Sequence, residues 1–187
     1  MGIPMKKSSL NILFVAVIIL LPIFSFGQGT QRLFKKDYSH TQKILAEIST
    51  SEGVMKFELL FDAAPNTVAN FMHLADSGFY KGLSFHRVIQ GFMVQGGDPK
   101  GDGTGGPGYT IPDEMTGNIK PEVGTLAMAN AGPNTGGSQF FVCQMPQPQL
   151  AGRYTIFGRM TSGFDVLTRI EKGDPIIDVK ISEITKP

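Results

Sequence analysis

The chain has 187 residues, 41% of them hydrophobic, and its 17 basic and 16 acidic side chains give a net charge of +1. This length and apolar content suffice for one domain with its own core. The positive charges are scattered, with no stripe that could follow successive phosphates, which argues against nucleic-acid binding. Cys143 is the only cysteine, so no intramolecular disulfide forms, and we expect a small buried side chain.

The N-terminus predicts an export signal. Lys6 and Lys7 precede the apolar run "LNILFVAVIILLPIFSFG", which ends at the small residue Gly27. This pattern is typical of a secretory signal peptide over residues 1–27, cleaved after Gly27, and it predicts a periplasmic or secreted protein. The alternative is an uncleaved membrane anchor, but the run is short for a bilayer span and contains Pro22. We expect membrane contact only through this segment, before cleavage.

A polar spacer and then a folded domain are predicted after the signal. Residues 28–43 lack a repeating apolar face, whereas the domain is expected over 44–187. It opens with "KILAEISTSEGVMKFELLF", which alternates with period two on both sides of Gly53 and so predicts a β-hairpin. A helix follows, beginning at Pro65 and ending before Gly78. Its apolar positions are Val68, Phe71, Met72 and Ala75.

Short β-rich segments dominate the rest of the chain. They are "SFHRVI", "FMVQG", "GTLAMA", "QFFVCQ" and "YTIFGRM". A second helix is predicted over "GFDVLTRIE", ending at Gly173, and "IIDVKISEIT" closes the chain as a strand. Many strands with only two helices predict a mainly β fold, a closed antiparallel barrel whose open ends the helices cover.

Three motifs that carry chemistry elsewhere are incomplete here. "GDGTGG" at 101–106 has the spacing of a dinucleotide loop, but Pro107 follows it and no helix begins there. The same loop resembles a calcium loop, yet Lys100 and Tyr109 stand at positions that need oxygen ligands. Ser138 in "GGSQF" lacks the final glycine of a nucleophile elbow.

The histidines also give no sign of a metal site. His40, His73 and His86 are the only three, and no pair has the spacing of metal ligands. We therefore expect neither a metal nor a cofactor, and His86 is interpreted as structural.

Three segments together resemble a known family. "FHRVIQGFMVQGGD", then "GDGTGGPGY", then "GTLAMANAGPNTGGSQFFV" are similar to segments of the cyclophilin-type peptidyl-prolyl cis-trans isomerases, in particular the short bacterial members. The resemblance extends from about Ile44 to Ile184, with the motifs in the family's order and spacing. It implies an eight-stranded barrel capped by two α-helices and an isomerase without a cofactor.

The resemblance gives Arg87 the catalytic role. Rotation about a prolyl peptide bond breaks no covalent bond, and it is slow because amide resonance must be lost, at about 18–20 kcal/mol. In the twisted transition state the imide nitrogen becomes pyramidal and regains its lone pair, so a fixed donor aimed at it lowers the barrier. A guanidinium suits this role because it stays charged and offers several donors in a rigid fork.

The resemblance also implies a groove for a proline-containing peptide. Its apolar slot for the proline ring would be formed by Phe92, Met93, Phe141 and Leu150, with Tyr154 at the rim. Gln95 and Asn130 join Arg87 as catalytic residues, because the peptide on either side must be held while one end turns. Ala129 and Gln139 extend these contacts, and the glycine-rich loops wall the groove.

Three positions depart from the family pattern. Gln90 replaces a usual proline and Tyr154 a usual histidine, and we expect neither change to abolish activity. Gln149, also assigned to the groove, stands where eukaryotic members carry the tryptophan associated with cyclosporin binding. We therefore expect weak binding of that drug.

The sequence thus predicts a monomeric isomerase acting on X-Pro bonds of unfolded or folding exported proteins. One alternative is a non-catalytic proline-peptide-binding chaperone that uses the same groove. Arg87 favours the enzyme, because binding alone needs no donor aimed at the imide nitrogen. A second alternative, a barrel enclosing a small hydrophobic ligand, predicts a roomy interior, whereas the large apolar side chains on the strands predict a filled one.

Overall fold

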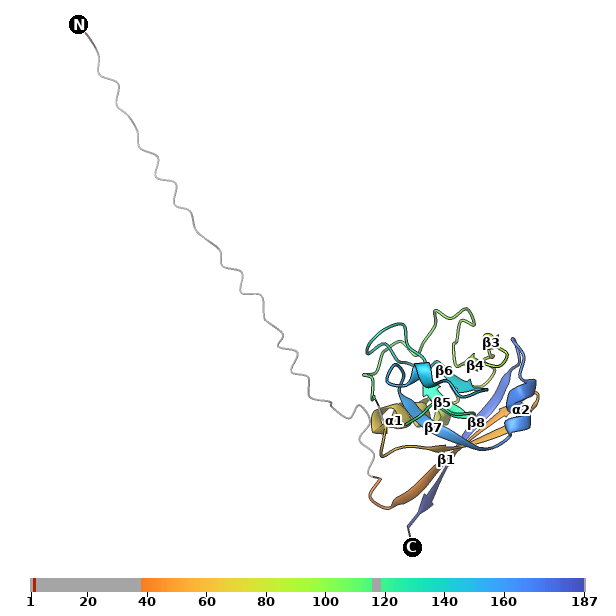
Figure 1. Ribbon diagram of the computed structural model, residues 1–187. Helices are drawn as coiled ribbons and strands as arrows, with labels where there is room; N and C mark the ends of the chain where they lie inside the picture. Colours follow the sequence, from red (N-terminus) through yellow and green to blue (C-terminus); the bar gives the residue numbers. More distant parts are fainter. Residues whose placement is uncertain (1, 3–37, 116–118, 187) are drawn as a thin grey trace.

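The structure is a computed structural model that describes residue 2, residues 38–115 and residues 119–186. The predicted signal segment, apart from Gly2, and most of the predicted spacer lie outside the described residues. Within the described part, no helix is both long enough and apolar enough to cross a membrane. The described chain is mainly β with two α-helices, as predicted (Figure 1).

The order of elements follows the predicted order. They are β1 (Thr41–Thr50), β2 (Gly53–Leu59), α1 (Pro65–Asp76), β3 (Arg87–Ile89), β4 (Met93–Gly96), β5 (Thr125–Met128), β6 (Phe140–Cys143), the 3-10 helix η1 (Pro148–Leu150), β7 (Ile156–Ser162), α2 (Phe164–Arg169) and β8 (Ile176–Thr185). β1 begins inside the predicted spacer, because Tyr38 packs on Phe61 at 5.3 Å between ring centroids and accepts a hydrogen bond from the Thr41 N–H.

The sheet is open, so the predicted closed barrel is wrong. All strand pairs are antiparallel and follow the order β3-β4-β6-β5-β7-β2-β1-β8, which curls into a half-barrel. Its edges, β3 and β8, approach each other in the described chain through one isolated bridge, Ser84 to Pro175, and nearby backbone hydrogen bonds. Pro175 has no N–H to donate and β3 has only three residues, so the ladder does not continue.

The inner face of the curled sheet carries the main core, called here the inner cluster. Its largest buried rings are Phe57, Phe71, Tyr80, Phe85, Phe140 and Phe157. Phe140 lies at the centre of several edge-on ring contacts, with its centroid 5.7 Å from that of Phe71 and 5.6 Å from that of Tyr80. These rings fill the interior, which disfavours a barrel that encloses a small ligand.

Helix α1 begins at Pro65, as predicted, and a distant glutamate completes its N-terminus. The Glu114 carboxylate accepts hydrogen bonds from the backbone N–H groups of Asn66 at 2.9 Å and Thr67 at 2.8 Å. These are N–H groups that the helix itself leaves unbonded, and a negative charge is favourable at this end. The helix ends at Asp76 and is followed by Gly78 at a φ of 73°, and the predicted apolar residues are buried.

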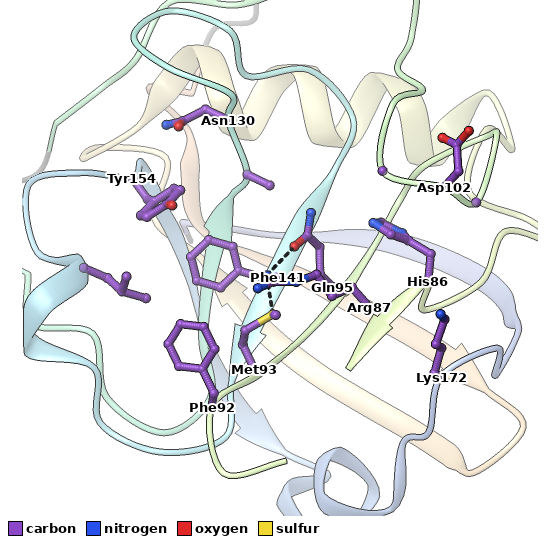
Figure 2. Close-up of a pocket in the computed structure, with 14 residues that line it drawn as sticks. His86, Arg87, Phe92, Met93, Gln95, Asp102, Asn130, Phe141, Tyr154 and Lys172 are labelled. Carbon is purple, nitrogen blue, oxygen red and sulfur yellow. Dashed lines mark hydrogen bonds between the residues drawn. The ribbon is translucent and has the colours of Figure 1, made fainter. Parts of the chain in front are cut away.

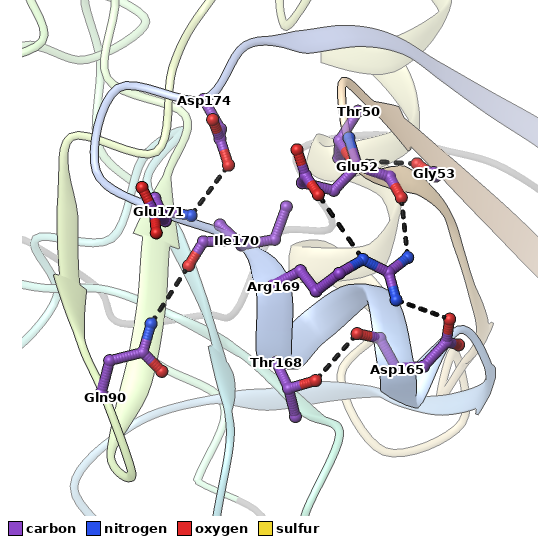
Figure 3. A network of polar contacts seen from close by, with 10 residues as sticks. All are labelled: Thr50, Glu52, Gly53, Gln90, Asp165, Thr168, Arg169, Ile170, Glu171 and Asp174. Atoms are coloured by element: carbon purple, nitrogen blue, oxygen red, sulfur yellow. Dashed lines mark hydrogen bonds and ion pairs between the residues drawn. The ribbon is translucent and has the colours of Figure 1, made fainter.

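Helix α2 is shorter than predicted and is tied to two turns by polar contacts (Figure 3). The Arg169 guanidinium forms ion pairs with Asp165 at 3.0 Å and with Glu52 of the β1–β2 turn at 3.5 Å. Gln90, in the β3–β4 turn, donates a hydrogen bond to the Ile170 carbonyl at 3.4 Å. A proline at position 90 would have no such donor, so this departure from the family pattern adds a link between the turn and α2.

The opposite face of the same strands carries a second apolar group, called here the outer cluster. Its buried members are Met93, Ala127, Phe141, Cys143 and Ile156, and half-buried Phe92, Ala129, Leu150 and Tyr154 pack against them. Along β6, Phe140 and Val142 face inward while Phe141 and Cys143 face outward, which is the period-two alternation of a strand. Cys143 is buried, as predicted, and burial raises its pKa to about 12.

Candidate active site

Strand register brings the central residues of the site into one row across four strands. Arg87 on β3 pairs with Gln95 on β4, Gln95 pairs with Phe141 on β6, and Phe141 pairs with Ala127 on β5. Side chains directly opposite each other in a sheet point to the same face. The guanidinium, the amide and the phenyl ring are therefore neighbours on the outer face, although 54 positions separate Arg87 from Phe141.

A chain of hydrogen bonds runs from the guanidinium to the glycine loop. Arg87 Nη1 lies 3.3 Å from Gln95 Oε1 and 3.9 Å from Met93 Sδ (Figure 2). Gln95 Nε2 donates to Gln139 Oε1 at 2.9 Å, and Gln139 Nε2 donates to the carbonyls of Gly103 and Gly105 at 3.0 and 2.8 Å. Arg87 is itself exposed, so its position depends on a series of partners anchored in the loop.

A groove of about 540 Å³ opens beside this row. Nine predicted site residues line it: Arg87, Phe92, Met93, Gln95, Ala129, Asn130, Phe141, Leu150 and Tyr154. Met93 and Phe141 form an apolar floor with only 2% and 5% of their surfaces exposed, and the Tyr154 ring meets the Phe141 ring edge-on at 5.1 Å. Figure 2 places the apolar rings together on one side of Arg87, where they leave an open slot.

The two remaining predicted residues lie outside this groove. Gln139 lines a neighbouring hollow and reaches the groove through Gln95. Gln149, in η1, is exposed and its side chain turns back to Gln147 Oε1 at 2.6 Å. Gln149 therefore precedes the slot residue Leu150 in the sequence, but it does not line the groove.

The glycine-rich loop is pinned by Asp98, which is only 1% exposed. Its carboxylate accepts hydrogen bonds from the backbone N–H groups of Lys100, Asp102 and Gly103. Burial alone would raise the pKa of Asp98, but these bonds and nearby His86 lower it below its ordinary value. The carboxylate is therefore charged at neutral pH and holds the loop as a wall of the groove, while "GDGTGG" opens no helix, as predicted.

Asn130 contributes to the rim through its own loop contacts. Its Nδ2 donates to the Arg153 carbonyl at 3.2 Å, and its Oδ1 accepts from the Gly132 N–H at 3.4 Å. The preceding residue, Ala129, donates its N–H to the Gln139 carbonyl at 2.9 Å. Two loops that are separate in sequence are thus joined along one side of the groove.

Besides Gly101 and Gly103 of the glycine-rich loop, three further residues line the groove that sequence reasoning did not assign to the site: His86, Asp102 and Lys172. His86 is only 9% exposed, and both its ring nitrogens lack a hydrogen-bond partner within the described chain. Burial lowers the pKa of His86, the Asp98 carboxylate opposes this, and Arg87 lowers it further, so the ring is neutral at pH 7. Adjacency to Arg87 was a signal for His86, whereas Lys172 comes from the turn after α2 and had none.

Side chains in the described part of the chain form no cluster of three or more histidine, cysteine or acidic residues that could hold a metal ion. The polar groups at the groove are donors and acceptors suited to a peptide: a guanidinium, amides and backbone carbonyls. An apolar slot beside a fixed cation can bind and orient an apolar residue of a peptide. The cation can also stabilise negative charge or a lone pair that develops next to that residue.

Comparisons with known proteins agree on one family. A family model described as "Cyclophilin type peptidyl-prolyl cis-trans isomerase/CLD" matches residues 45–186. The chain belongs to the cyclophilin family. The predicted enzyme class, a peptidyl-prolyl cis-trans isomerase, is thereby confirmed.

Bacterial peptidyl-prolyl cis-trans isomerases are among its similar relatives. The chain is 55% identical to peptidyl-prolyl cis-trans isomerase B of Bacillus subtilis over 128 residues, which cover 68% of this chain and 90% of that protein. It is 53% identical to a peptidyl-prolyl cis-trans isomerase of Synechococcus elongatus over 144 residues, or 75% of this chain and 96% of the relative.

Solved cyclophilin structures share the fold. A cyclophilin-type isomerase of Cryptosporidium parvum matches 78% of this chain and 99% of its own with a TM-score of 0.70 and 37% identity. A structure of a Cryptosporidium parvum cyclophilin-type isomerase in the presence of the dipeptide Ala-Pro covers 75% of this chain and 99% of its own, with a TM-score of 0.68 and 39% identity.

Proposed function

We propose that this cyclophilin accelerates rotation about X-Pro peptide bonds in the groove beside Arg87. The proline ring occupies the slot floored by Met93 and Phe141 and flanked by Phe92, Leu150 and Tyr154. The slot suits a ring because its floor is nearly fully buried on the protein side and apolar, so that it removes further apolar surface from water. The ring is then fixed while the residue before it turns.

The observation that carries this proposal is the position of the Arg87 guanidinium at the edge of the slot. Its contacts to Gln95 and Met93 both use Nη1, so Nε and Nη2 remain for a substrate among the described residues. As the prolyl bond twists, the imide nitrogen loses resonance and gains a lone pair, and a donor already aimed at it stabilises this state more than the planar one. No bond to carbon is made or broken.

The peptide is held in this mechanism by Gln95, Asn130 and Ala129, which line the groove, and Gln139 supports them by fixing Gln95. Gln95 also orients Arg87, since its amide oxygen accepts from the guanidinium while its nitrogen is committed to Gln139. A peptide held on both sides of the bond rotates about that bond alone, and this orientation is a large part of what a groove adds to catalysis.

Turnover separates an isomerase from the alternative, a chaperone that only binds proline peptides. We expect the purified protein, far below the peptide concentration, to speed cis-trans exchange of an Ala-Pro peptide in NMR exchange spectroscopy. A chaperone would shift peptide resonances without changing the exchange rate. Shifts alone, with unchanged exchange, would therefore overturn the proposal.

We further propose that the protein is a short bacterial cyclophilin exported by its N-terminal segment and cut after Gly27. The support is the sequence pattern of residues 1–27 and the match to bacterial relatives over 90% and 96% of their lengths. It would then act on X-Pro bonds of proteins folding in the periplasm or outside the cell. Mass spectrometry of the exported protein should give an N-terminus at Gln28, whereas an intact N-terminus in the membrane fraction would indicate an anchor.

A further inference from the structure

The groove does not end at Arg87. On the side away from the proline slot it continues between His86, Asp102 and Lys172 (Figure 2), and these three residues are called here the polar end. They come from the segment before β3, from the glycine-rich loop and from the turn between α2 and β8. A peptide whose proline fills the slot and whose backbone passes Arg87 therefore places a neighbouring side chain in the polar end.

Lys172 gives this end a positive charge that is unpaired among the described residues. Its side chain is exposed, and within the described chain no hydrogen bond or ion pair occupies its ammonium group. Its charge reaches His86, whose pKa it helps to lower after the larger effect of burial. Together with Arg87 it puts two positive charges along one stretch of the groove.

Asp102 is the one acidic residue of the lining, and its carboxylate is engaged in its own loop. Oδ1 accepts hydrogen bonds from the Thr104 N–H at 2.8 Å and from the Thr104 hydroxyl at 2.7 Å. Lys100, on the same loop, lies close enough to help lower its pKa after these bonds. Asp102 therefore stays negatively charged, but its bonds are made within the loop, so the ammonium of Lys172 remains unpaired in the described chain. Arg87, Lys172 and Asp102 together leave the groove lining with a net positive charge.

His86 is a second sign that this end receives a ligand. The ring is nine-tenths buried, it borders the groove, and neither nitrogen has a partner among the described residues. A buried polar group without a partner is costly, and such groups are uncommon in folded proteins. Each nitrogen has less than 1 Å² of exposed surface, so a polar group of a bound peptide in the polar end would supply the missing partner after a turn of the ring toward the groove.

We infer that the polar end selects substrates by charge, with Lys172 favouring a carboxylate side chain on a residue next to the X-Pro bond. This inference rests on the proposed isomerase function and adds a preference within it. Because Lys172 is exposed, it acts mainly by attracting the peptide and is screened by salt. We expect an effect of about 1.5- to 5-fold in kcat/KM, the range of an exposed ion pair.

The test uses the full chain and two series of acetylated, amidated Ala-Pro-based peptides. One series carries Glu, Gln or Lys before the proline and the other carries them after it, and NMR exchange spectroscopy gives kcat/KM without a coupling protease. In at least one series we expect Glu to exceed Gln and Gln to exceed Lys at low salt, with the differences shrinking at high salt.

Variants assign the preference to its residue. Lys172→Gln should flatten the order and Lys172→Glu should reverse it. Lys180→Glu is the matched control, because Lys180 is an exposed lysine on β8 outside the groove lining and the substitution changes the net charge equally. It should keep the wild-type order.

Three results would overturn the inference: equal kcat/KM for all peptides in both series, an order that survives Lys172→Glu, or an order that Lys180→Glu reverses as well. The first two remove Lys172 from specificity, and the third reduces the effect to overall charge. Failure of the proposed function looks different, because then no peptide, charged or neutral, exchanges faster with the protein than without it.

Discussion

The inner and outer clusters share strands β4 to β7 and the same kinds of side chain, yet only the outer cluster lines the groove. Phe140 and Phe141 are neighbours in sequence and lie on opposite faces of β6. The inner face is covered by the curl of the sheet and by α1, so its rings contact other rings on all sides. Within the described residues, η1 and loops cover the outer face and leave the slot between Phe92, Leu150 and Tyr154.

The difference shows that coverage by the rest of the chain, and not composition, decides whether an apolar cluster forms a core or lines a groove. Met93 and Phe141 are as apolar and almost as buried as the inner residues, but the chain leaves one side of their cluster open as the groove, where we propose that the proline ring binds. Arg87 and Gln95 lie on that same face, where a charge keeps access to water. Substitutions on the two faces should therefore affect different quantities.

The largest expected effect is on stability, from a substitution in the inner cluster. Phe140→Ala removes a fully buried ring that meets Phe71, Tyr80 and Phe85, and should lower the free energy of unfolding by about 3–5 kcal/mol. Phe141→Ala is the matched control on the outer face and should cost less stability while lowering kcat/KM for Ala-Pro peptides. Urea unfolding and NMR exchange measure the two quantities. Equal losses of stability would contradict the separation of the clusters.

The next effect is on catalysis alone. Arg87→Ala should lower kcat by two to three orders of magnitude, about 2.7–4 kcal/mol, because it removes the donor at the imide nitrogen. Arg87 is exposed, so unfolding should change by no more than about 0.5 kcal/mol. Arg159→Ala, which removes an exposed arginine on β7 outside the groove lining, is the control and should keep full activity. Near-full activity of a folded Arg87→Ala protein would exclude Arg87 as the donor.

Local sequence patterns predicted most of the fold, because they report which face of an element is buried. The alternation around Gly53 gave the β1–β2 hairpin, and the helical spacing after Pro65 gave α1. Closure of the sheet depends on whether two distant edges pair, and nothing local to Ser84 or Pro175 reveals that they meet in a single bridge. The barrel was therefore predicted as closed although it is open.

The same limit applies to the site. The resemblance indicated Arg87, Gln95 and Phe141, and strand register brings them into one row. Lys172 and Asp102 reach the groove only through the packing of loops, which leaves no periodic trace in sequence. Gln149 was assigned to the groove from its alignment with a tryptophan, but a shorter, flexible side chain bonded to Gln147 does not reach the lining.

A smaller effect is expected at the rim of the slot, where a ring can extend the outer cluster. Gln149→Trp should tighten cyclosporin binding by about 1–3 kcal/mol, because an indole beside Leu150 adds apolar surface that the exposed glutamine lacks. Turnover of a short Ala-Pro peptide should stay within a few-fold. Gln42→Trp, on β1 outside the groove lining, is the matched control. Calorimetry decides: tight binding by the unsubstituted protein, or no gain from the tryptophan at 149, would contradict this position for residue 149.

The smallest expected effect is on the pH dependence of stability, and it comes from His86. Burial lowers the pKa of His86 from 6.5, Asp98 and Asp102 oppose this, and Arg87 and Lys172 add to it. Between the lowered pKa and 6.5 the unfolded chain binds more protons than the folded one, so the stability due to this histidine is complete above pH 6.5 and is lost as pH falls through the folded pKa. Asp98 acts only in more acidic solution, since its pKa is lowered from 3.8.

His86→Gln cannot take up a proton, so its free energy of unfolding should decline less than that of the unsubstituted protein just below pH 6.5, and the two curves should run parallel above that pH. Urea unfolding across this interval measures the difference, and parallel curves on both sides of pH 6.5 would mean that the ring gains a partner or solvent when it is protonated.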